Sequence, residues 1–384
     1  MAVPNIGPLV DADGIWDHQI TDTFAVTDSS DREWTEEIWA SLAAKDGSLQ
    51  VDFGLGKYTN RNVVDGFGGI SRGREQWTVR ASRSLQSEPN ATSVGPLPYT
   101  IVEPHSVVRF TLAKSDVRPI AFDLTLTGAL PPFFEGRNRY RGASNRLEQD
   151  VVRYNQGGNV TGWVEMDGER HEVGADDWFG IRDHSWGMRG DIIGIRPTDL
   201  QPAFRPTRSK GQRGPWLLVR PDGKPYYVAL MSVGMFFNQV SGFFSGYVNH
   251  PDGRQDRVVT LETDFSVEPR TRYLQRGSFV LTTEAEATHN IEVTPLGETG
   301  FHLRTGWYGQ WKGGAHGIRR GESHVEGEYI PDCVAVVSQL GQVRDRPVKV
   351  VDGDAAGYGI LETWPEGPWP EFGLAEDGWE DGTP

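Results

Sequence analysis

The segment TGWVEMDGERHEV, residues Thr161 to Val173, decides how this chain folds. Two short arms, residues 161–166 and 169–173, flank the pair Asp167-Gly168. Asp-Gly is a preferred sequence for the tight turn between two antiparallel strands, because both positions tolerate a positive φ. The segment therefore predicts a β-hairpin.

Two further segments repeat this pattern around Pro-Asp-Gly turns. Residues 216–220 and 225–231 flank the turn at 221–223, and residues 242–248 and 257–263 flank the turn at 251–253. Alternation between turn residues also predicts strands at 107–112, 119–127, 278–284, 289–294, 300–305, 323–330, 334–339 and 357–363. The best helical pattern is residues 32–44, where Trp34, Ile38 and Leu42 recur at four-residue spacing. Many strands with few short helices predict an all-β protein.

The length of 384 residues exceeds what one hydrophobic core usually supports, so we expect two domains. Composition changes at residues 203–214, a basic segment with Pro and Gly that lacks periodicity, and we interpret it as a linker. The predicted organisation is an N-terminal β-domain (1–202), the linker (203–214), a C-terminal β-domain (215–370) and an acidic tail (371–384). We expect each domain to be an antiparallel barrel or sandwich, packed side by side with the other.

The formal net charge of −15 argues against nucleic acid and anionic membranes as partners, because both attract basic surfaces. A single cysteine, Cys333, excludes a disulfide framework and fits a reducing compartment; its apolar, strand-like surroundings predict a buried thiol. The N-terminal residues lack the basic and apolar regions of a leader, and no segment approaches the ~18 apolar residues of a membrane span. We therefore expect a cytoplasmic protein without membrane insertion.

Residues 176–187, DDWFGIRDHSWG, are the strongest candidate for a functional site. If this segment is extended, Trp178, Arg182, His184 and Trp186 share one face of a sheet, and Asp183 lies on the opposite face. Histidine exchanges protons near neutral pH, and indole rings stabilise positive charge and bind apolar surfaces. The segment predicts either a cavity wall with a catalytic histidine or a buried polar network that fixes a strand crossing.

A second candidate is the segment from Gly357 to Trp364, GYGILETW. As a strand it places Tyr358, Glu362 and Trp364 on one face, and a glutamate among aromatic rings is a candidate general acid or base. The alternative is a glutamate paired with an arginine. A third cluster, residues 313–329, carries alternating His and Glu, but side chains two apart on a strand converge poorly on a metal ion. We expect a solvated or salt-bridged face there and no metal site.

Two of these segments resemble a known family. The sequence Trp178-Phe-Gly-Ile-Arg-Asp-His-Ser-Trp-Gly187, together with Gly357-x-Gly359-x-x-Glu362, is similar to motifs of the lipocalin-like double-barrel family that includes the AttH proteins, carotenoid 1,2-hydratases and Diels–Alderase-type cyclases. The chain departs from the family pattern at Arg182, where several relatives carry an apolar or aromatic residue, and at Ile360, which replaces a tyrosine. The resemblance implies two lipocalin-like domains, an apolar pocket at or near their interface, and chemistry without a cofactor.

The favoured hypothesis is a cofactor-independent lyase or isomerase, such as a hydratase, dehydratase or cyclase. Its substrate would be a bulky apolar small molecule such as a terpenoid, steroid or polyketide, with His184, Asp183 and Glu362 as the catalytic residues. The expected substrate-binding residues are Trp186, Trp178, Arg182, Tyr358, Trp364 and Tyr247. The alternatives are a lipocalin-like carrier of a hydrophobic ligand and a purely structural protein with a filled core. A homodimer is compatible with these expectations.

Overall fold

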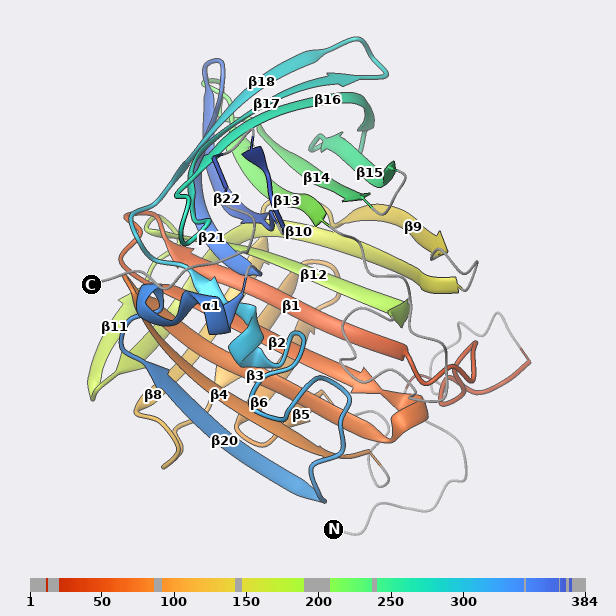
Figure 1. Cartoon of the computed structure of the whole chain (residues 1–384), viewed down its shortest axis with the longest axis vertical. Helices are drawn as coiled ribbons and strands as arrows, with labels where there is room; N and C mark the ends of the chain where they lie inside the picture. The colour runs from red at the N-terminus through yellow and green to blue at the C-terminus, as the bar shows by residue number, and fades with distance from the viewer. Residues whose placement is uncertain are drawn as a thin grey trace.

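The computed structural model describes residues 12, 21–85, 92–141, 147–189, 208–236, 240–341, 343–365, 367–370 and 373–374. Their strands form two antiparallel β-structures that lie side by side, a curled sheet and a barrel (Figure 1). The predicted all-β fold with two packed β-structures is confirmed. None of the described helices is long and apolar enough to cross a membrane.

The curled sheet contains thirteen of the described strands, in the order β20-β4-β3-β2-β1-β12-β10-β8-β7-β6-β5, with β9 and β11 paired to β10. It is an open half-barrel rather than a closed one, since the order ends at β20 and β5. Its strands are β1 (Trp34–Ala44), β2 (Gln50–Tyr58), β3 (Val63–Arg72), β4 (Glu75–Ser84), β5 (Ser93–Val94), β6 (Leu97–Glu103), β7 (Val107–Leu112), β8 (Ile120–Gly128), β9 (Phe133–Arg141), β10 (Leu147–Met166), β11 (Glu169–Val173), β12 (Trp178–Arg189) and β20 (Ser323–Ile330).

The barrel is built from the other nine described strands, in the order β18-β17-β16-β15-β14-β13-β22-β21-β19. Pairing of β18 with β21 closes the barrel and leaves β19 outside the ring. The strands are β13 (Arg208–Val219), β14 (Pro225–Phe236), β15 (Val240–Asn249), β16 (Gln255–Val267), β17 (Leu274–Thr283), β18 (Thr288–Pro295), β19 (Phe301–His302), β21 (Arg344–Asp352) and β22 (Ala355–Thr363). The described helices are the 3-10 turns η2 (Thr59–Arg61), η3 (Leu303–Gly306) and η4 (Val334–Val336) and the short helix α1 (Val337–Leu340).

All three predicted hairpins are present, as β10–β11, β13–β14 and β15–β16. The predicted helix at 32–44 is wrong, because these residues form β1. Four-residue spacing is also a multiple of the two-residue period of a strand, so Ile38 and Leu42 share a face in either structure. The strand predicted at 334–339 is also wrong, since η4 and α1 occupy it, and the strand predicted at 300–305 is shortened to β19 before η3.

The domain boundary differs from the predicted one in two places. Residues 208–214 of the expected linker belong to β13, where their backbone pairs with β14. β20, which the sequence places in the C-terminal domain, instead pairs with β4 at the edge of the first sheet. Residues 203–207, and the expected tail apart from 373–374, lie outside the described residues.

Three apolar clusters follow from the alternation along the strands. Ile38, Ala40 and Leu42 of β1 pack inside the curled sheet, and a second cluster fills the barrel. Trp39 and Ala43, on the other face of β1, join a third cluster that lies between the two β-structures. β1 is therefore buried on both faces, which is why it contains no exposed position.

Candidate active site

The face of the first sheet that is turned toward the barrel is polar although it is buried. Eight of its polar side chains are each no more than 4% exposed: Glu37, Ser41, Gln50, Asp52, Asp65, Asn155, Asp183 and Ser185. Buried polar groups are costly unless they are paired, so the partners of these side chains decide what this face can do.

At the centre of this face, two carboxyl groups from different β-structures contact each other. Asp52 of β2 and Asp345 of β21 are both fully buried and lie within hydrogen-bonding reach of one another. The second oxygen of each is held by a neighbour: Gln50 Nε2 donates to Asp52 Oδ2 at 2.7 Å, and Trp39 Nε1 donates to Asp345 Oδ2 at 2.8 Å. Two carboxylates this close repel one another, and protonation of one of them removes the repulsion.

The electrostatics of the pair favour protonation near neutral pH. Burial raises the pKa of Asp345 well above its usual range, and the negative charges of Glu362 and Asp52 raise it further. Burial also raises the pKa of Asp52, to about 7. Both shifts favour a pair that holds a proton at physiological pH.

Arg213 of β13 is a buried cation at the same interface. It donates to Asp183, to Glu362 Oε1 at 3.2 Å and to Asn155 Oδ1 at 3.0 Å, and its guanidinium lies 4.7 Å from the ring centroid of Trp39. Burial alone would lower the pKa of Arg213, but the charges of Asp183 and Glu362 raise it above its usual value. Arg213 therefore joins a carboxylate of the sheet to a carboxylate of the barrel.

Further along the same face, a second set of buried groups surrounds Tyr308. Tyr58 donates to Glu37 Oε1 at 3.0 Å, and Arg189 donates to Glu37 Oε2 at 2.8 Å. His316 Nδ1 lies 2.9 Å from Asp65 Oδ1; burial lowers the pKa of His316, but Asp65 raises it by more. The Tyr308 ring meets His316 edge-on at 4.6 Å. The His316–Asp65 pair thus lies on the same face as the Asp52–Asp345 pair.

The structure brings several of the sequence-predicted site residues to this interface. Asp183 and Glu362 lie at opposite ends of the Arg213 bridge. Tyr358 stacks on Phe179 with centroids 5.4 Å apart, and Tyr247 lies 5.0 Å from Phe133. Trp364 packs on Gly211, two positions before Arg213, where a side chain at Gly211 would collide with its indole.

The other predicted residues lie on the opposite face of β12, as the alternation predicted. His184 Nδ1 lies 3.0 Å from the Tyr154 hydroxyl and its Nε2 lies 2.9 Å from Glu36 Oε1, and Trp186 packs edge-on at 5.4 Å. Arg182 donates to Gln156 through Nε and Nη2. Trp178 belongs to the core inside the curled sheet. The strand therefore separates His184 from Asp183, and the two do not form a dyad.

The predicted salt-bridged character of residues 313–329 agrees with the contacts around β20. Glu326 contacts Arg80, Arg320 and His324, and Glu328 contacts Arg80 and Lys312. Among the described residues, no group of three or more His, Cys, Asp or Glu side chains is arranged to hold a metal ion. Cys333 is buried as predicted, and burial raises the pKa of its thiol to about 12, although it precedes η4 rather than lying in a strand.

Sequence reasoning missed Asp52, Asp345, Arg213 and His316. Asp52 and Asp345 are far apart in the chain, and their pairing depends on how the barrel docks on the sheet. The available signal was the pair Gln50 and Asp52, which share one strand face while Val51, Phe53 and Leu55 occupy the other. Arg213 was concealed because its segment was interpreted as a linker.

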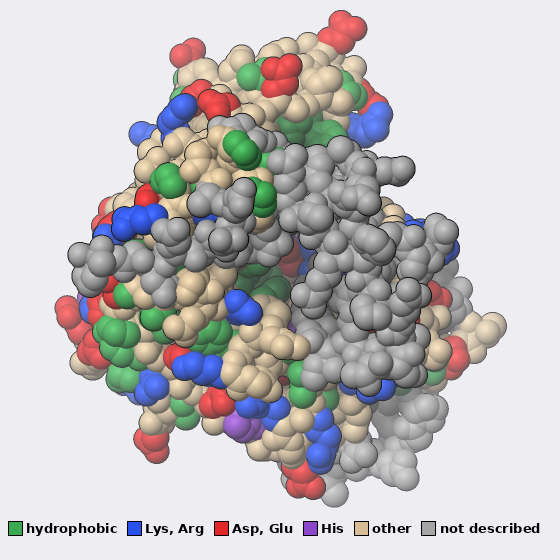
Figure 2. Space-filling model, viewed as in Figure 1, with side chains coloured by type: hydrophobic (Ala, Val, Ile, Leu, Met, Phe, Trp, Pro, Cys, Tyr) green, Lys and Arg blue, Asp and Glu red, His purple; other side chains and the backbone are tan. Residues whose placement is uncertain are grey.

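The face of the molecule in Figure 2 is hollowed near its centre, between the barrel and the curled sheet, and hydrophobic, acidic and basic side chains are visible in the hollow. An apolar cluster contributed by both β-structures lies between them, with Trp39, Phe67, Phe133, Tyr227 and Ile360 among its members. The interface therefore combines apolar surface with a buried carboxyl pair and buried charges, which is the usual composition of a small-molecule site.

This architecture, a curled sheet docked on a closed barrel, defines the class of fold. It is similar to the crystal structure of an AttH-like protein from Nitrosomonas europaea, with 15% identity, a TM-score of 0.50, and coverage of 86% of this chain and 91% of that chain. Kievitone hydratase from Nectria haematococca also matches, at 11% identity, a TM-score of 0.42, and 86% and 89% coverage. CghA with Sch210972 matches at 11% identity, a TM-score of 0.46, and 91% and 90% coverage. The predicted resemblance to this group is confirmed for the fold.

The particular family is given by the sequence. A family of unknown function, DUF8625, matches residues 10–375, and the chain belongs to it. No curated protein matches the chain by sequence.

Proposed function

We propose that the chain is a cofactor-independent lyase or isomerase that acts by acid–base chemistry on a bulky apolar small molecule at the interface between its two β-structures. The observation that carries the proposal is the Asp52–Asp345 pair, a buried acid that keeps its proton near neutral pH. A general acid is most effective when its pKa lies near the working pH, and burial produces that condition here.

In the proposed reaction, Asp345 donates its proton to an alkene carbon or to a leaving hydroxyl group of the substrate. The resulting Asp345 carboxylate is held by the indole N–H of Trp39 and neighbours the second carboxyl, Asp52. When a proton is later lost from the substrate cation, or from the water that adds to it, the carboxylate takes it back. The pair is thereby returned to its starting state and no other reagent is consumed.

Arg213 is a positioning residue in this proposal. By pairing with Asp183 and Glu362, it fixes two negative charges near the acid pair. The charge of Glu362 raises the pKa of Asp345, and negative charges near the reacting carbon also favour a cationic intermediate. Asp183 and Glu362 therefore keep a role in the proposed site, through electrostatics rather than through direct proton transfer.

The apolar part of the interface supports the proposed substrate class. Phe67, Phe133 and Tyr247 belong to the cluster between the two β-structures, and such surfaces bind hydrocarbon skeletons rather than polar metabolites. A terpenoid, steroid or polyketide fits this requirement. The direction of the reaction, hydration, dehydration or cyclisation, follows from whether water or an internal carbon captures the cation.

The test is turnover by an Asp345→Asn variant. Native mass spectrometry of the purified chain identifies a retained apolar compound, and that compound or a panel of polyenes is incubated in deuterated water. We expect wild type to incorporate deuterium into product and Asp345→Asn to lose about 10²–10⁴-fold of that rate. The matched control is Asp264→Asn, whose side chain is 71% exposed on the barrel. A folded Asp345→Asn variant with wild-type turnover would contradict the proposal, and unfolding of both Asp345→Asn and Asp52→Asn would assign the pair to the fold.

A carrier without chemistry is the second candidate. It is favoured by the ion pairing of Asp183 with Arg213 and by the contact of His184 with Glu36, which leave neither side chain free for proton transfer. A carrier would retain the apolar ligand in mass spectrometry and return it unlabelled. An enzyme would return a labelled product.

A further inference from the structure

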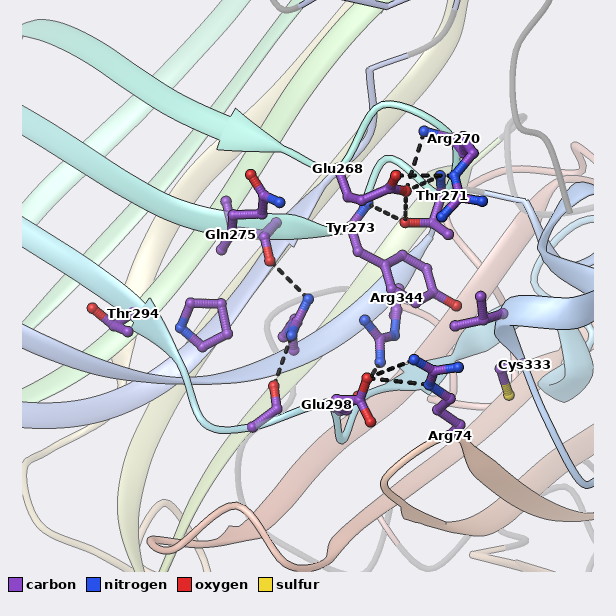
Figure 3. Close-up of a pocket in the computed structure, with 15 residues that line it drawn as sticks. Arg74, Glu268, Arg270, Thr271, Tyr273, Gln275, Thr294, Glu298, Cys333 and Arg344 are labelled. Carbon is purple, nitrogen blue, oxygen red and sulfur yellow. Dashed lines mark hydrogen bonds and ion pairs between the residues drawn. The ribbon is translucent and has the colours of Figure 1, made fainter. Parts of the chain in front are cut away.

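A cavity of about 460 Å³ lies apart from the acid pair, at the edge where the barrel meets the sheet. Its walls come from the turn before β4, the β16–β17 connection, the end of β18, the segment before η4, and β21 (Figure 3). Its volume is within the range of small-molecule sites. The residues that decide its chemistry are Arg344 and Arg346 of β21 and Tyr273.

Arg344 and Arg346 are two cations without a carboxylate partner among the residues that the structure describes. Arg344 is only 7% exposed, and its Nη2 donates to the backbone oxygen of Glu298 at 2.6 Å. Arg346 donates to the backbone oxygens of Leu274 and Gly297 at 2.8 and 2.7 Å. Within the described part of the chain, no carboxylate lies within ion-pair distance of either guanidinium, and Arg344 Nε and Nη1 have no hydrogen-bond partner.

The neighbouring carboxylates of the cavity are already engaged. Glu298 pairs with Arg74 at 3.0 Å, and Glu268 pairs with Arg270 at 3.2 Å and accepts hydrogen bonds from Thr271. Burial lowers the pKa of Arg346 to about 9, and the like charge of Arg344 contributes. A buried pair of like charges is unfavourable unless a counter-charge is bound.

Tyr273 holds the Arg344 guanidinium in a fixed position. The guanidinium lies 3.8 Å from the Tyr273 ring centroid (Figure 3), and the Tyr273 hydroxyl lies 2.7 Å from His302 Nε2. Burial and the charge of Arg344 lower the pKa of His302 well below its usual value, so the imidazole is neutral and adds no third cation. On the other side, Arg344 packs on Gly300, where a Cβ atom would come within 2.5 Å of Nε. A preorganised guanidinium is suited to binding an oxyanion.

We propose that this cavity binds a small organic carboxylate, with Arg344 and Arg346 as the anion-binding residues. Leu274, Pro295 and Val334 supply apolar wall for the body of the ligand. Glu268 and Glu298 at the same cavity disfavour a multiply charged phosphate, which leaves the carboxylate as the matching anion. The site is separate from the proposed acid pair, since adjacent residues of a strand point to opposite faces and Asp345 contacts Asp52.

The test is isothermal titration calorimetry on the full chain with benzoate, benzamide and inorganic phosphate. We expect benzoate to bind and benzamide, its uncharged analogue, to show no binding. We expect Arg344→Gln to weaken the binding of benzoate at least about tenfold, since a charge-assisted hydrogen bond contributes more than 1.4 kcal/mol. The matched control is Arg254→Gln, an exposed arginine on a barrel turn, which is expected to leave the affinity unchanged.

Arg346→Gln is the second variant if Arg344→Gln does not fold, and the same loss is expected. The inference is overturned if benzoate fails to bind wild type, if benzamide binds equally well, or if phosphate binds and benzoate does not. Retention of wild-type affinity by a folded Arg344→Gln or Arg346→Gln variant also overturns it. None of these outcomes depends on turnover, so they separate this inference from the proposed acid chemistry.

Discussion

Asp52 and Glu36, which lie on opposite faces of the first sheet, differ in their electrostatics: Asp52 is fully buried, and the Glu36 side chain is 40% exposed. On the face toward the barrel, Asp52 and Asp345 contact each other, and burial raises the pKa of both. On the opposite face, burial would raise the pKa of Glu36, but His184 and Lys57 lower it to about 2. The local supply of cations therefore decides whether a carboxyl in this fold is a proton donor or a fixed anion.

Substitution of Arg213 is expected to have the largest effect on stability, because it removes the cation that Asp183 and Glu362 share. Arg213→Met leaves Asp183 and Glu362 without their shared cation in a buried interface, and we expect a loss of about 3–5 kcal/mol in the free energy of unfolding. Urea denaturation measures this loss. Arg254→Met, at a side chain that is 52% exposed, is the control and should change stability by less than about 0.5 kcal/mol. Equal effects of the two variants would show that the Arg213 bridge is not a buried ion pair.

The contributions of Asp52 and Glu36 to stability are expected to depend on pH with opposite signs. Because the folded-state pKa of Asp52 is about 7 and its usual value is 3.8, its stabilisation is complete below pH 3.8 and is lost as pH rises through 7. Glu36 has the opposite sign: its lowered pKa gives a stabilisation that is present above pH 4.5 and is lost as pH falls toward 2.

Thermal melts of two variants across pH test these signs. Relative to Asp52→Asn, the free energy of unfolding of wild type should fall by on the order of a few kcal/mol between pH 4 and 8. Relative to Glu36→Gln, wild type should instead lose stability on the acid side. A wild type that gains stability relative to Asp52→Asn as pH rises would mean that Asp52 is an ordinary ionised carboxylate.

His184→Ala is expected to have the smallest effect. The variant loses the partly buried contacts of His184 with Tyr154 and Glu36. We therefore expect its free energy of unfolding to fall by about 1–2 kcal/mol. Turnover should remain, because His184 faces away from the interface that holds the acid pair. If His184→Ala abolishes turnover while Asp345→Asn keeps it, the active site lies inside the curled sheet and the original prediction for His184 is correct.

Local patterns predicted the parts of this molecule that depend on near neighbours. Turn residues such as Asp167-Gly168 located the hairpins, and the two-residue period separated Asp183 from His184. The same period is compatible with the four-residue spacing of Ile38 and Leu42, so β1 was predicted as a helix.

The acid pair was beyond the reach of these patterns. Asp52 and Asp345 belong to different β-structures, and only the docking of the barrel on the sheet brings them together. Arg213 is similar, since its strand pairing with β14 and β22 is a tertiary property that composition does not reveal. The sequence therefore predicts Asp183 and Glu362 at the interface, but it does not predict the Asp52–Asp345 pair.

The most direct test of the central claim is infrared spectroscopy of the carboxyl groups at neutral pH. We expect wild type at pH 7 to show the C=O stretching band of a protonated carboxyl group. The band should shift in deuterated water and should be absent in Asp345→Asn. Asp264→Asn, at an exposed position, should retain the band. A spectrum that shows only ionised carboxylates at pH 7, or a band that persists in Asp345→Asn, would contradict a protonated Asp52–Asp345 pair.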